Sequence, residues 1–279
     1  MKPVFDKVTV IGVGLIGASL ARGIKKNKIA RETAGYFRRK EALKEAVRGK
    51  IVDKGYLDIT SAVKGAELVI FAVPVYEIIK VAEAIKDFIP PGALVTDIGS
   101  TKSQIVKKLS KIYSNYVGAH PLAGSEKKGA EFSSPDLFKG KVTVLTPVKM
   151  TNVKTTAVMK KFWKALGAKV LIIPPDIHDK MVSRISHLPH LLMYSLMNMV
   201  GDDSLQYASS GFKDSTRIAA SDPHIWTEIF LSNKKYLSKD IDLFIKHLEK
   251  YKKFLSNSGK KRLSSVIEDA SDKRKQLEQ

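Results

Sequence analysis

Two side chains that could move a proton follow successive strand-like runs of the chain. Ser100 lies in the turn "VTDIGSTK" (95–102), and His120 lies in "GAHPLAGSEKKG" (118–129). The carboxyl ends of parallel strands meet at the rim where ligands bind, so we expect both residues there. Histidine suits a general base near neutral pH, because its ordinary pKa is about 6.5. On spacing alone, His120 could equally be a structural histidine at a strand end.

A second polar cluster is predicted on a helix farther along the chain. The segment "SRISHLPHLLMYSL" (183–196) spaces Arg184, His187 and His190 three residues apart, so their side chains are expected along one helix face. Pro189 is expected to kink that helix by removing a backbone hydrogen bond. No HExxH pattern and no carboxylate within a turn accompany the histidines, so no metal site is predicted. Packing and a binding site explain this cluster equally well.

A third cluster follows in "GFKDSTRIAASDPHIW" (211–226), which contains Lys213, Asp214, Arg217 and Trp226. An arginine here could bind a carboxylate through two hydrogen bonds, and a tryptophan could stack on a ring. The alternative is a solvated helix start capped by Asp214.

A phosphate-binding loop is predicted near the N-terminus. The segment "VTVIGVGLIGASLARGIKK" (8–26) places Gly12, Gly14 and Gly17 after an apolar strand and at the start of a helix. The first glycine allows a tight turn, the second lets a pyrophosphate approach the backbone, and the third lets helix and strand pack closely. An ordinary glycine-rich turn is the alternative, but the flanking strand and helix favour dinucleotide binding.

The end of the second predicted strand departs from the usual NAD pattern. About twenty residues after the loop, an NAD site places Asp or Glu against the ribose 2′-hydroxyl, whereas this chain has Phe37, Arg38 and Arg39. A carboxylate would repel a 2′-phosphate, and a guanidinium could bind one, so NADP is predicted over NAD. The alternative is that both arginines are solvated charges at the next helix start. The full set of predicted cofactor-binding residues is Gly12, Gly14, Leu15, Ile16, Gly17, Arg38, Arg39, Pro74 and Ser100.

The order of apolar runs predicts a two-domain α/β chain. Six such runs alternate with amphipathic segments from residue 8 to residue 173, which indicates a mostly parallel sheet with helices on both faces. Prolines end the last run, and Asp176 is expected to cap the first of three helices at 177–200, 222–257 and 260–277, with "GDDS" and "SSGFKD" as connections. Helix 177–200 is apolar on more than one face, which indicates deep burial, within the chain or between subunits. The predicted domains are 1–174, which binds the dinucleotide, and 175–279, which is helical.

Composition narrows the class of protein. The 279 residues are 44% hydrophobic, include no cysteine and carry a net charge of +20. No signal peptide or membrane span is recognised, and we expect a cytoplasmic protein. Lysines on solvated helix faces explain most of the charge. Nucleic acid is not an expected partner, because no module and no stripe of basic and aromatic residues is found.

Five motifs resemble, in order, those of the prephenate and arogenate dehydrogenase family: "VIGVGLIGASLA", "VTDIGSTK", "GAHPLAGSEKKG", "SHLPH" and "GFKDSTRIAASDP". The resemblance extends over most of the chain. It implies a Rossmann-like, doubly wound, mostly parallel sheet followed by an all-α dimerisation domain that forms a homodimer. It also implies oxidative decarboxylation of prephenate to 4-hydroxyphenylpyruvate in tyrosine biosynthesis, with hydride transfer from C4 to NADP.

The resemblance also assigns residue roles. His120 accepts a hydrogen bond from the C4 hydroxyl with Ser100 beside it, and Arg217 binds the substrate carboxylate. Members that use NADP carry an arginine close to the position of Arg38. The other residues that the resemblance places in the substrate pocket are Glu126, His187, His190, Asp214 and Trp226.

Other functions stay open at this point. Glu126 and His190 favour prephenate, because arogenate-specific members can lack both; an arogenate or dual cyclohexadienyl dehydrogenase is the first alternative. Arg184 departs from the small or apolar residue expected there and leaves room for an altered pocket. A different β-hydroxyacid or imine dehydrogenase would place a catalytic lysine in the helical domain. A non-catalytic NADP-sensing or nucleic-acid-associated protein is the remote alternative.

Overall fold

The protein is represented by a computed structural model that describes residues 3–124, 127, 129–256 and 259–278. The chain divides into two compact units, Met1–Asn233 and Lys234–Gln279. The first unit contains the strands and most of the residues named above.

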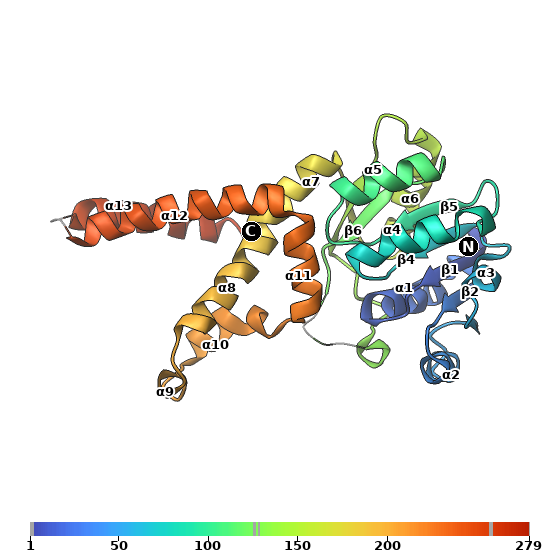
Figure 1. Ribbon diagram of the computed structural model, residues 1–279, viewed down its shortest axis with the longest axis horizontal. Coiled ribbons are helices and arrows are strands. Elements are labelled where there is room, and N and C mark those ends of the chain that lie inside the picture. The colour runs from blue at the N-terminus through green and yellow to red at the C-terminus, as the bar shows by residue number, and fades with distance from the viewer. Residues whose placement is uncertain (1–2, 125–126, 128, 257–258, 279) are drawn as a thin grey trace. The chain divides into compact units, whose positions relative to one another are not determined.

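A five-stranded parallel sheet forms the centre of the first unit (Figure 1). Its order is β3-β2-β1-β4-β5, so the chain winds outward from β1 in both directions, which confirms the doubly wound prediction. The shortest strand, β3, was not predicted, because its three residues are too few to show a pattern. The strands are β1 (Phe5–Ile11), β2 (Ala30–Tyr36), β3 (Lys54–Tyr56), β4 (Leu68–Phe71) and β5 (Leu94–Asp97).

Helices pack two separate hydrophobic cores against this sheet. Alternation along β1 sends Val8 and Val10 into one core and Ile11 into the other, because successive strand residues point to opposite faces. The first core takes α1 (Leu15–Lys26), α2 (Lys40–Arg48) and α6 (Val153–Ala165). The second takes α3 (Ile59–Val63), α4 (Val75–Ala84) and α5 (Ser103–Ile112).

The last three strands hydrogen-bond as a separate sheet of order β6-β7-β8. β6 (Gly118–Pro121) runs antiparallel to β7 (Val142–Thr146), and β7 is parallel to β8 (Lys169–Ile172). A single parallel bridge between Val95 and Tyr116 connects the region to β5. The carboxyl end of β6, which carries His120, therefore lies beside the carboxyl end of β5.

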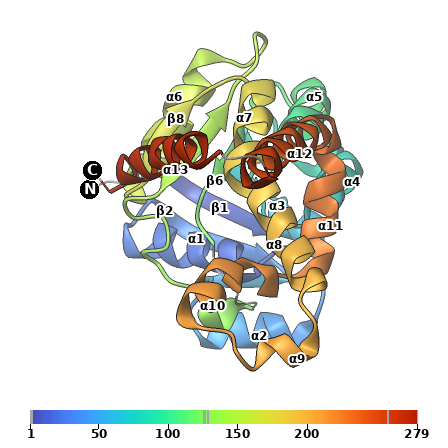
Figure 2. The ribbon, with the colours of Figure 1, turned by 90° about the vertical axis from the view of Figure 1, so that its left-hand side faces the viewer.

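A set of helices completes the first unit. Within it, α8 and α11 lie alongside each other (Figure 2), with the Tyr194 and Phe230 rings 6.3 Å apart. The prediction of plain connections at "GDDS" and "SSGFKD" was wrong, because two short helices form there; they are too short to show a helical period. The helices are α7 (Pro175–Val182), the π-helical segment η3 (Ser183–His187), α8 (Leu188–Met199), α9 (Asp202–Leu205), α10 (Ser210–Thr216) and α11 (Pro223–Ser232).

The structure refines three local expectations for this region. Asp176 does not cap α7: the capping position is Pro174, and the Asp176 carboxylate accepts a hydrogen bond from Ser103 Oγ at 2.9 Å. Pro189 lies in the first turn of α8, where a missing N–H costs least, and the wide turn of η3 directly precedes it. The predicted helix 177–200 has buried residues only in α7 and η3; no residue of α8 is fully buried in the single chain, so deep burial within the chain is wrong for that part.

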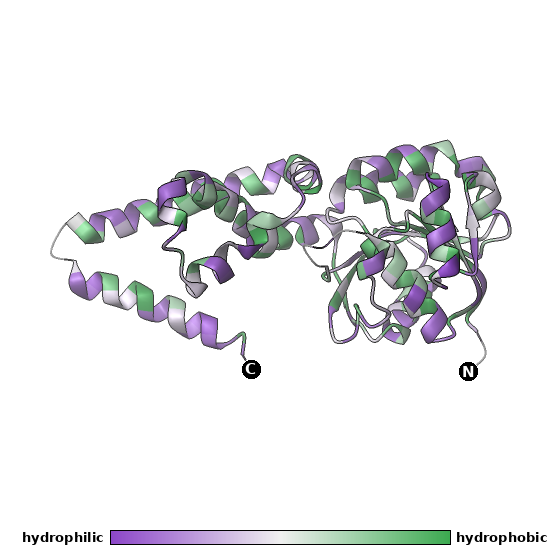
Figure 3. Ribbon diagram, turned by 90° about the horizontal axis from the view of Figure 1, so that it is seen from below, coloured by the Kyte–Doolittle hydropathy of each residue, from purple (hydrophilic) through white to green (hydrophobic). Residues whose placement is uncertain are grey.

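The second unit consists of α12 (Lys234–Ser256) and α13 (Lys260–Lys275). Polar and apolar residues are mixed along both helices (Figure 3). The predicted helix 222–257 is two helices, which meet at Asn233, the C-terminal capping residue of α11. Among the residues that the structure describes, no helix could serve as a membrane span.

Candidate active site

The glycine-rich loop between β1 and α1 has the shape of a dinucleotide cradle. Gly12 has φ +94°, and a Cβ there would lie 2.6 Å from the carbonyl oxygen of Ala72. A Cβ on Gly17 would lie 2.0 Å from the Gly12 carbonyl oxygen, whereas one on Gly14 would meet nothing within 4 Å. Gly14 therefore leaves open space at the N-terminus of α1, where a helix favours an anion. These residues fit a bound pyrophosphate.

The chain after β2 offers cations where an NAD site offers a carboxylate. The Phe37 side chain is buried, and its ring folds back against Gly35, where a Cβ would lie 2.8 Å from the ring. Arg38 and Arg39 are exposed, and neither guanidinium bonds another residue within the described part of the chain. Both guanidinium groups are therefore available to an external anion.

A buried ion pair joins the strand ends that carry Ser100 and His120. The Lys102 ammonium group bonds the Asp97 carboxylate and donates to the Ala119 carbonyl oxygen at 2.8 Å. Asp97 also accepts from Tyr116 Oη at 2.6 Å and from the Gly99 N–H at 2.8 Å. Burial lowers the pKa of Lys102 against the opposing effect of Asp97. The pair ties β5 to β6 directly before His120, and partly exposed Ser100 lies within the same turn.

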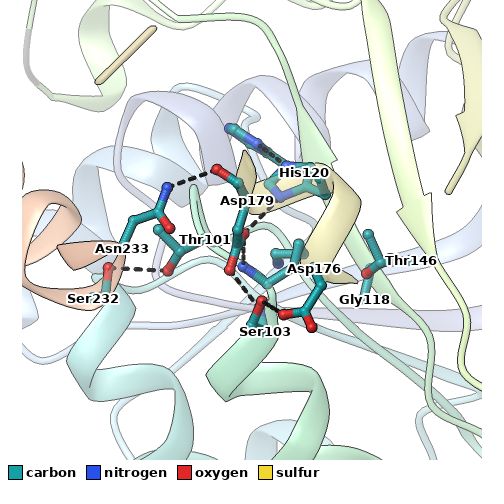
Figure 4. Close-up of polar contacts among 12 residues, drawn as sticks. Thr101, Ser103, Gly118, His120, Thr146, Asp176, Asp179, Ser232 and Asn233 are labelled. Atoms are coloured by element: carbon teal, nitrogen blue, oxygen red, sulfur yellow. Dashed lines mark hydrogen bonds and ion pairs between the residues drawn. The ribbon is translucent and has the colours of Figure 1, made fainter. Parts of the chain in front are cut away.

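His120 is hydrogen-bonded to a second histidine and, through it, to a carboxylate. Its Nδ1 lies 2.8 Å from Nε2 of His178, and Nδ1 of His178 lies 2.8 Å from Asp179 Oδ1 (Figure 4). Burial lowers the pKa of His120 well below its ordinary value, and repulsion from Lys102 and from the cationic forms of His178 and His187 lowers it further. His120 is therefore a neutral imidazole at neutral pH, able to accept a proton.

Asp179 has a second role, because its carboxylate accepts the first backbone N–H groups of α5. Oδ1 accepts from the Lys102 N–H at 2.7 Å and Oδ2 from the Ser103 N–H at 2.8 Å. Burial raises the pKa of Asp179, but the hydrogen bonds from His178 and Ser103 together bring it below its ordinary value. The carboxylate is ionised, and it fixes the position of α7 against α5.

The predicted histidine pair on η3 and α8 splits between two environments. His187 is buried, and its Nδ1 lies 3.0 Å from Nδ2 of Asn233, which also donates to the Asp179 carbonyl oxygen at 2.8 Å. His190 stacks on Trp226 with ring centroids 3.5 Å apart and an interplanar angle of 19°. The His187 ring lies 6.1 Å from Trp226, so these rings connect the two environments.

Arg217 lies close enough to His190 for its positive charge to affect that ring. Burial is the largest cause that lowers the pKa of His190, and Arg217 lowers it as well. The structure thus contains one series of neighbouring side chains, made up of His120, His187, His190, Trp226 and Arg217. An arginine near stacked rings at a strand rim can bind an anionic, ring-shaped molecule.

The other predicted site residues differ in their exposure and position. Asp214 is exposed on α10, Arg184 is exposed on η3, and Pro74 is exposed at the N-terminal capping position of α4. Leu15 and Ile16 begin α1 beside the glycine cradle. Glu126 lies outside the described residues.

The sequence reasoning missed the residues that support His120. Lys102 and Asp97 lie inside the motif "VTDIGSTK", and His178 and Asp179 are the last two residues of "IIPPDIHD". The available signal was an aspartate at the end of an apolar strand with a lysine after it in the same motif. The pairing of His178 with His120 had none, because it joins residues 58 positions apart.

Comparisons with known proteins agree with this geometry. Residues 20–172 match the family model for the prephenate dehydrogenase nucleotide-binding domain, and residues 174–269 match the one for the prephenate dehydrogenase dimerization domain. A prephenate dehydrogenase of Lactococcus lactis is 33% identical over 98% of this chain and 77% of its own. A cyclohexadienyl dehydrogenase of Zymomonas mobilis is 32% identical over 88% of this chain and 87% of its own. The crystal structure of prephenate dehydrogenase from Aquifex aeolicus, in complex with hydroxyphenyl propionate and NAD+, superposes with a TM-score of 0.92 at 32% identity and covers 99% of this chain and 98% of that one.

Proposed function

The chain belongs to the prephenate dehydrogenase family, and we propose that it oxidatively decarboxylates prephenate to 4-hydroxyphenylpyruvate in tyrosine biosynthesis with NADP as the preferred cofactor. The observation that carries the proposal is neutral, partly exposed His120 at the carboxyl end of β6, which is influenced by His187, whose ring neighbours Trp226 and, through it, His190. A base, a ring-stacking surface and a nearby arginine are what a charged cyclic substrate needs.

The protein's own residues have a limited task in this reaction. Formation of an aromatic ring with loss of carbon dioxide supplies the driving force, so the enzyme must orient the substrate and accept the proton of its C4 hydroxyl. His120 accepts that proton on the ring nitrogen that His178 leaves unused, and Ser100 orients the hydroxyl. Arg217 binds a substrate carboxylate, and His190 and Trp226 pack the ring. A bound nicotinamide cofactor supplies the acceptor for the hydride that leaves C4.

The preference for NADP is supported by the end of β2. Buried Phe37 presents no charge, and the exposed Arg38 and Arg39 can bind a 2′-phosphate. We expect Arg38→Ala with Arg39→Ala to raise the KM for NADP by about tenfold or more while that for NAD changes little. Equal losses for both cofactors would mean that the arginines only support α2. Lys44→Ala, which removes an exposed cation of the same helix outside this turn, is the matched control.

A second candidate function is the oxidation of arogenate, alone or together with prephenate. It is favoured by the similarity to the Zymomonas mobilis cyclohexadienyl dehydrogenase, which is nearly as close as that to the Lactococcus lactis enzyme. Measuring NADPH and NADH formation with each substrate in turn separates the candidates. Turnover of neither substrate with either cofactor would refute both.

We also propose that residues 175–279 form the helical substrate and dimerisation domain of a homodimer. The match of residues 174–269 to the dimerization-domain model and the lack of any fully buried residue on apolar helix α8 support this. Sedimentation equilibrium should give twice the chain mass. A charged residue in place of an outward apolar one on α8, Met199→Glu, which is 79% exposed in the single chain, should weaken the association if the helix is covered by a second chain.

A further inference from the structure

We propose that His178 and Asp179 form a hydrogen-bond relay that holds His120 in a single tautomer, with the proton on Nδ1 and the lone pair on Nε2. The inference rests on the proposed function, in which His120 accepts the substrate hydroxyl proton. His178 and Asp179 act through His120, so they are positioning residues.

The direction of the relay follows from its carboxylate end. Asp179 is ionised, since its pKa lies below the ordinary value, and a carboxylate can only accept hydrogen bonds. The 2.8 Å contact between Asp179 Oδ1 and His178 Nδ1 therefore requires the proton to reside on Nδ1 of His178. The same Oδ1 also accepts the backbone N–H of Lys102, which holds the carboxylate in place.

The second step passes this constraint from His178 to His120. Burial lowers the pKa of His178 even against the opposing effect of Asp179, so the ring is neutral and carries one proton. With Nδ1 protonated, Nε2 of His178 has a lone pair and can only accept. The 2.8 Å contact between the two rings therefore places a proton on Nδ1 of His120. Nε2 of His120 is left as the lone pair that faces the substrate.

The consequence for catalysis is twofold. In the other tautomer, His120 would present an N–H to the substrate hydroxyl and could not accept its proton. After proton transfer, the imidazolium keeps its Nδ1–H bond to His178, and the ionised Asp179 behind that ring stabilises the new charge. Without the relay, both the resting tautomer and the product cation are less favoured.

Several other ionisable groups face these rings. His120 is approached by Lys102 from the turn before α5 and by His187 from η3. The charges of Lys102 and Asp97, as well as that of Asp179, affect the pKa of His178. Lys102 is paired with Asp97, so its charge is largely balanced, and burial keeps His187 neutral at neutral pH. Asp179 is the acceptor that fixes the order of protons along the relay.

The resting tautomer can be tested without substrate. In protein labelled with ¹⁵N at its six histidines, the His120 resonances, assigned by their loss in His120→Asn, should show Nδ1 protonated and Nε2 unprotonated at pH 7. Free histidine favours the opposite tautomer. In His178→Phe, which keeps a buried ring but removes the acceptor, the signals should move toward the free-histidine pattern.

The same variant tests the effect on catalysis. We expect His178→Phe to lower kcat by about 10²- to 10⁴-fold, as loss of the orienting carboxylate does in Ser-His-Asp triads. In the pH profile of kcat/KM, the acid limb should shift to lower pH by about one unit, because the His120 cation loses its hydrogen-bond acceptor and its pKa falls. Ser110→Ala, which removes the bond from Ser110 Oγ to the Val106 carbonyl oxygen within α5 and touches neither imidazole nor Asp179, should change neither quantity.

Two results would overturn the relay. One is a wild-type His120 with its proton on Nε2. The other is a pH profile in His178→Phe that keeps its wild-type acid limb, whatever the loss of kcat, because a purely structural role would produce that pattern. Neither result contradicts the proposed function as long as the wild-type enzyme converts prephenate. Conversely, a wild-type enzyme that has the predicted tautomer but does not convert prephenate would contradict the proposed function alone.

Discussion

Replacing Lys102 with methionine keeps the length of a buried side chain and removes its ammonium group. Lys102 and Asp97 are both fully buried and hydrogen-bonded to each other. In the variant, Asp97 retains the bonds from Tyr116 Oη and the Gly99 N–H but loses its opposite charge. The Ala119 carbonyl oxygen also loses a donor, directly beside His120.

The expected cost follows from this geometry. Breaking a buried ion pair by removing one partner costs about 3–5 kcal/mol, because the remaining charge stays buried. That is a large part of the roughly 5–15 kcal/mol by which a domain is stable. For a unit of this size, each kcal/mol lowers the melting temperature by about 2–4 °C, so a fall of about 6–20 °C is expected.

Urea unfolding followed by circular dichroism, together with calorimetry, measures this loss. Lys54→Met is the matched control, since the 2.6 Å pair of Lys54 with Glu32 lies at the surface, with 61% of the lysine side chain exposed, and water screens it. Adding Asp97→Asn to Lys102→Met should restore much of the stability, because no charge is then left buried. If Lys102→Met unfolds at the same urea concentration as the control, the pair does not hold the two strand ends together.

Three further outcomes are expected. His120→Asn should lower kcat by about 10²- to 10⁴-fold with little change in cofactor affinity, and near-normal turnover would remove His120 as the base. Arg217→Ala should raise the substrate KM by about tenfold to a hundredfold, whereas an unchanged KM would contradict its role in binding the carboxylate. Burial lowers the pKa of His187 to about 4, below the ordinary 6.5, so the unfolded chain binds the proton first as pH falls. The stability that neutral His187 contributes is therefore present above about pH 6.5 and is lost as the pH falls from there to about 4. The free energy of unfolding of His187→Gln should fall less steeply across this window than that of wild type. Equal slopes would show that His187 does not titrate as inferred.

The sequence predicted the features that a short stretch of chain determines. The cradle around Gly12, Gly14 and Gly17 depends on backbone freedom at fixed spacing, and the parallel sheet depends on local apolar runs. The absence of a carboxylate at position 37 was also predictable, because it depends on the residue type at one position. The burial of the Phe37 ring was not predictable in this way. Features that depend on long-range contacts were missed. Examples are the antiparallel β6–β7 pairing and the bond between His120 and His178, because neither leaves a periodic signal in the chain.

The π-helical turn at η3 explains why one predicted helix face became two environments. In a regular α-helix, His187 and His190 would point along the same face, as the i, i+3 spacing predicts. A π turn takes more residues than an α turn and so rotates the helix before it relative to the helix after it. His187, the last residue of η3, is thus directed into the buried network with Asn233, while His190, in the first turn of α8, stacks on Trp226. Pro189 adds little energetic cost to this arrangement, because its missing N–H lies in the first turn of α8, where the backbone hydrogen bonds of that helix are only beginning. The wide turn therefore lets two neighbouring histidines serve different purposes: His187 holds α11 against α7, and His190 stacks on Trp226, where the proposed function has it pack the substrate ring.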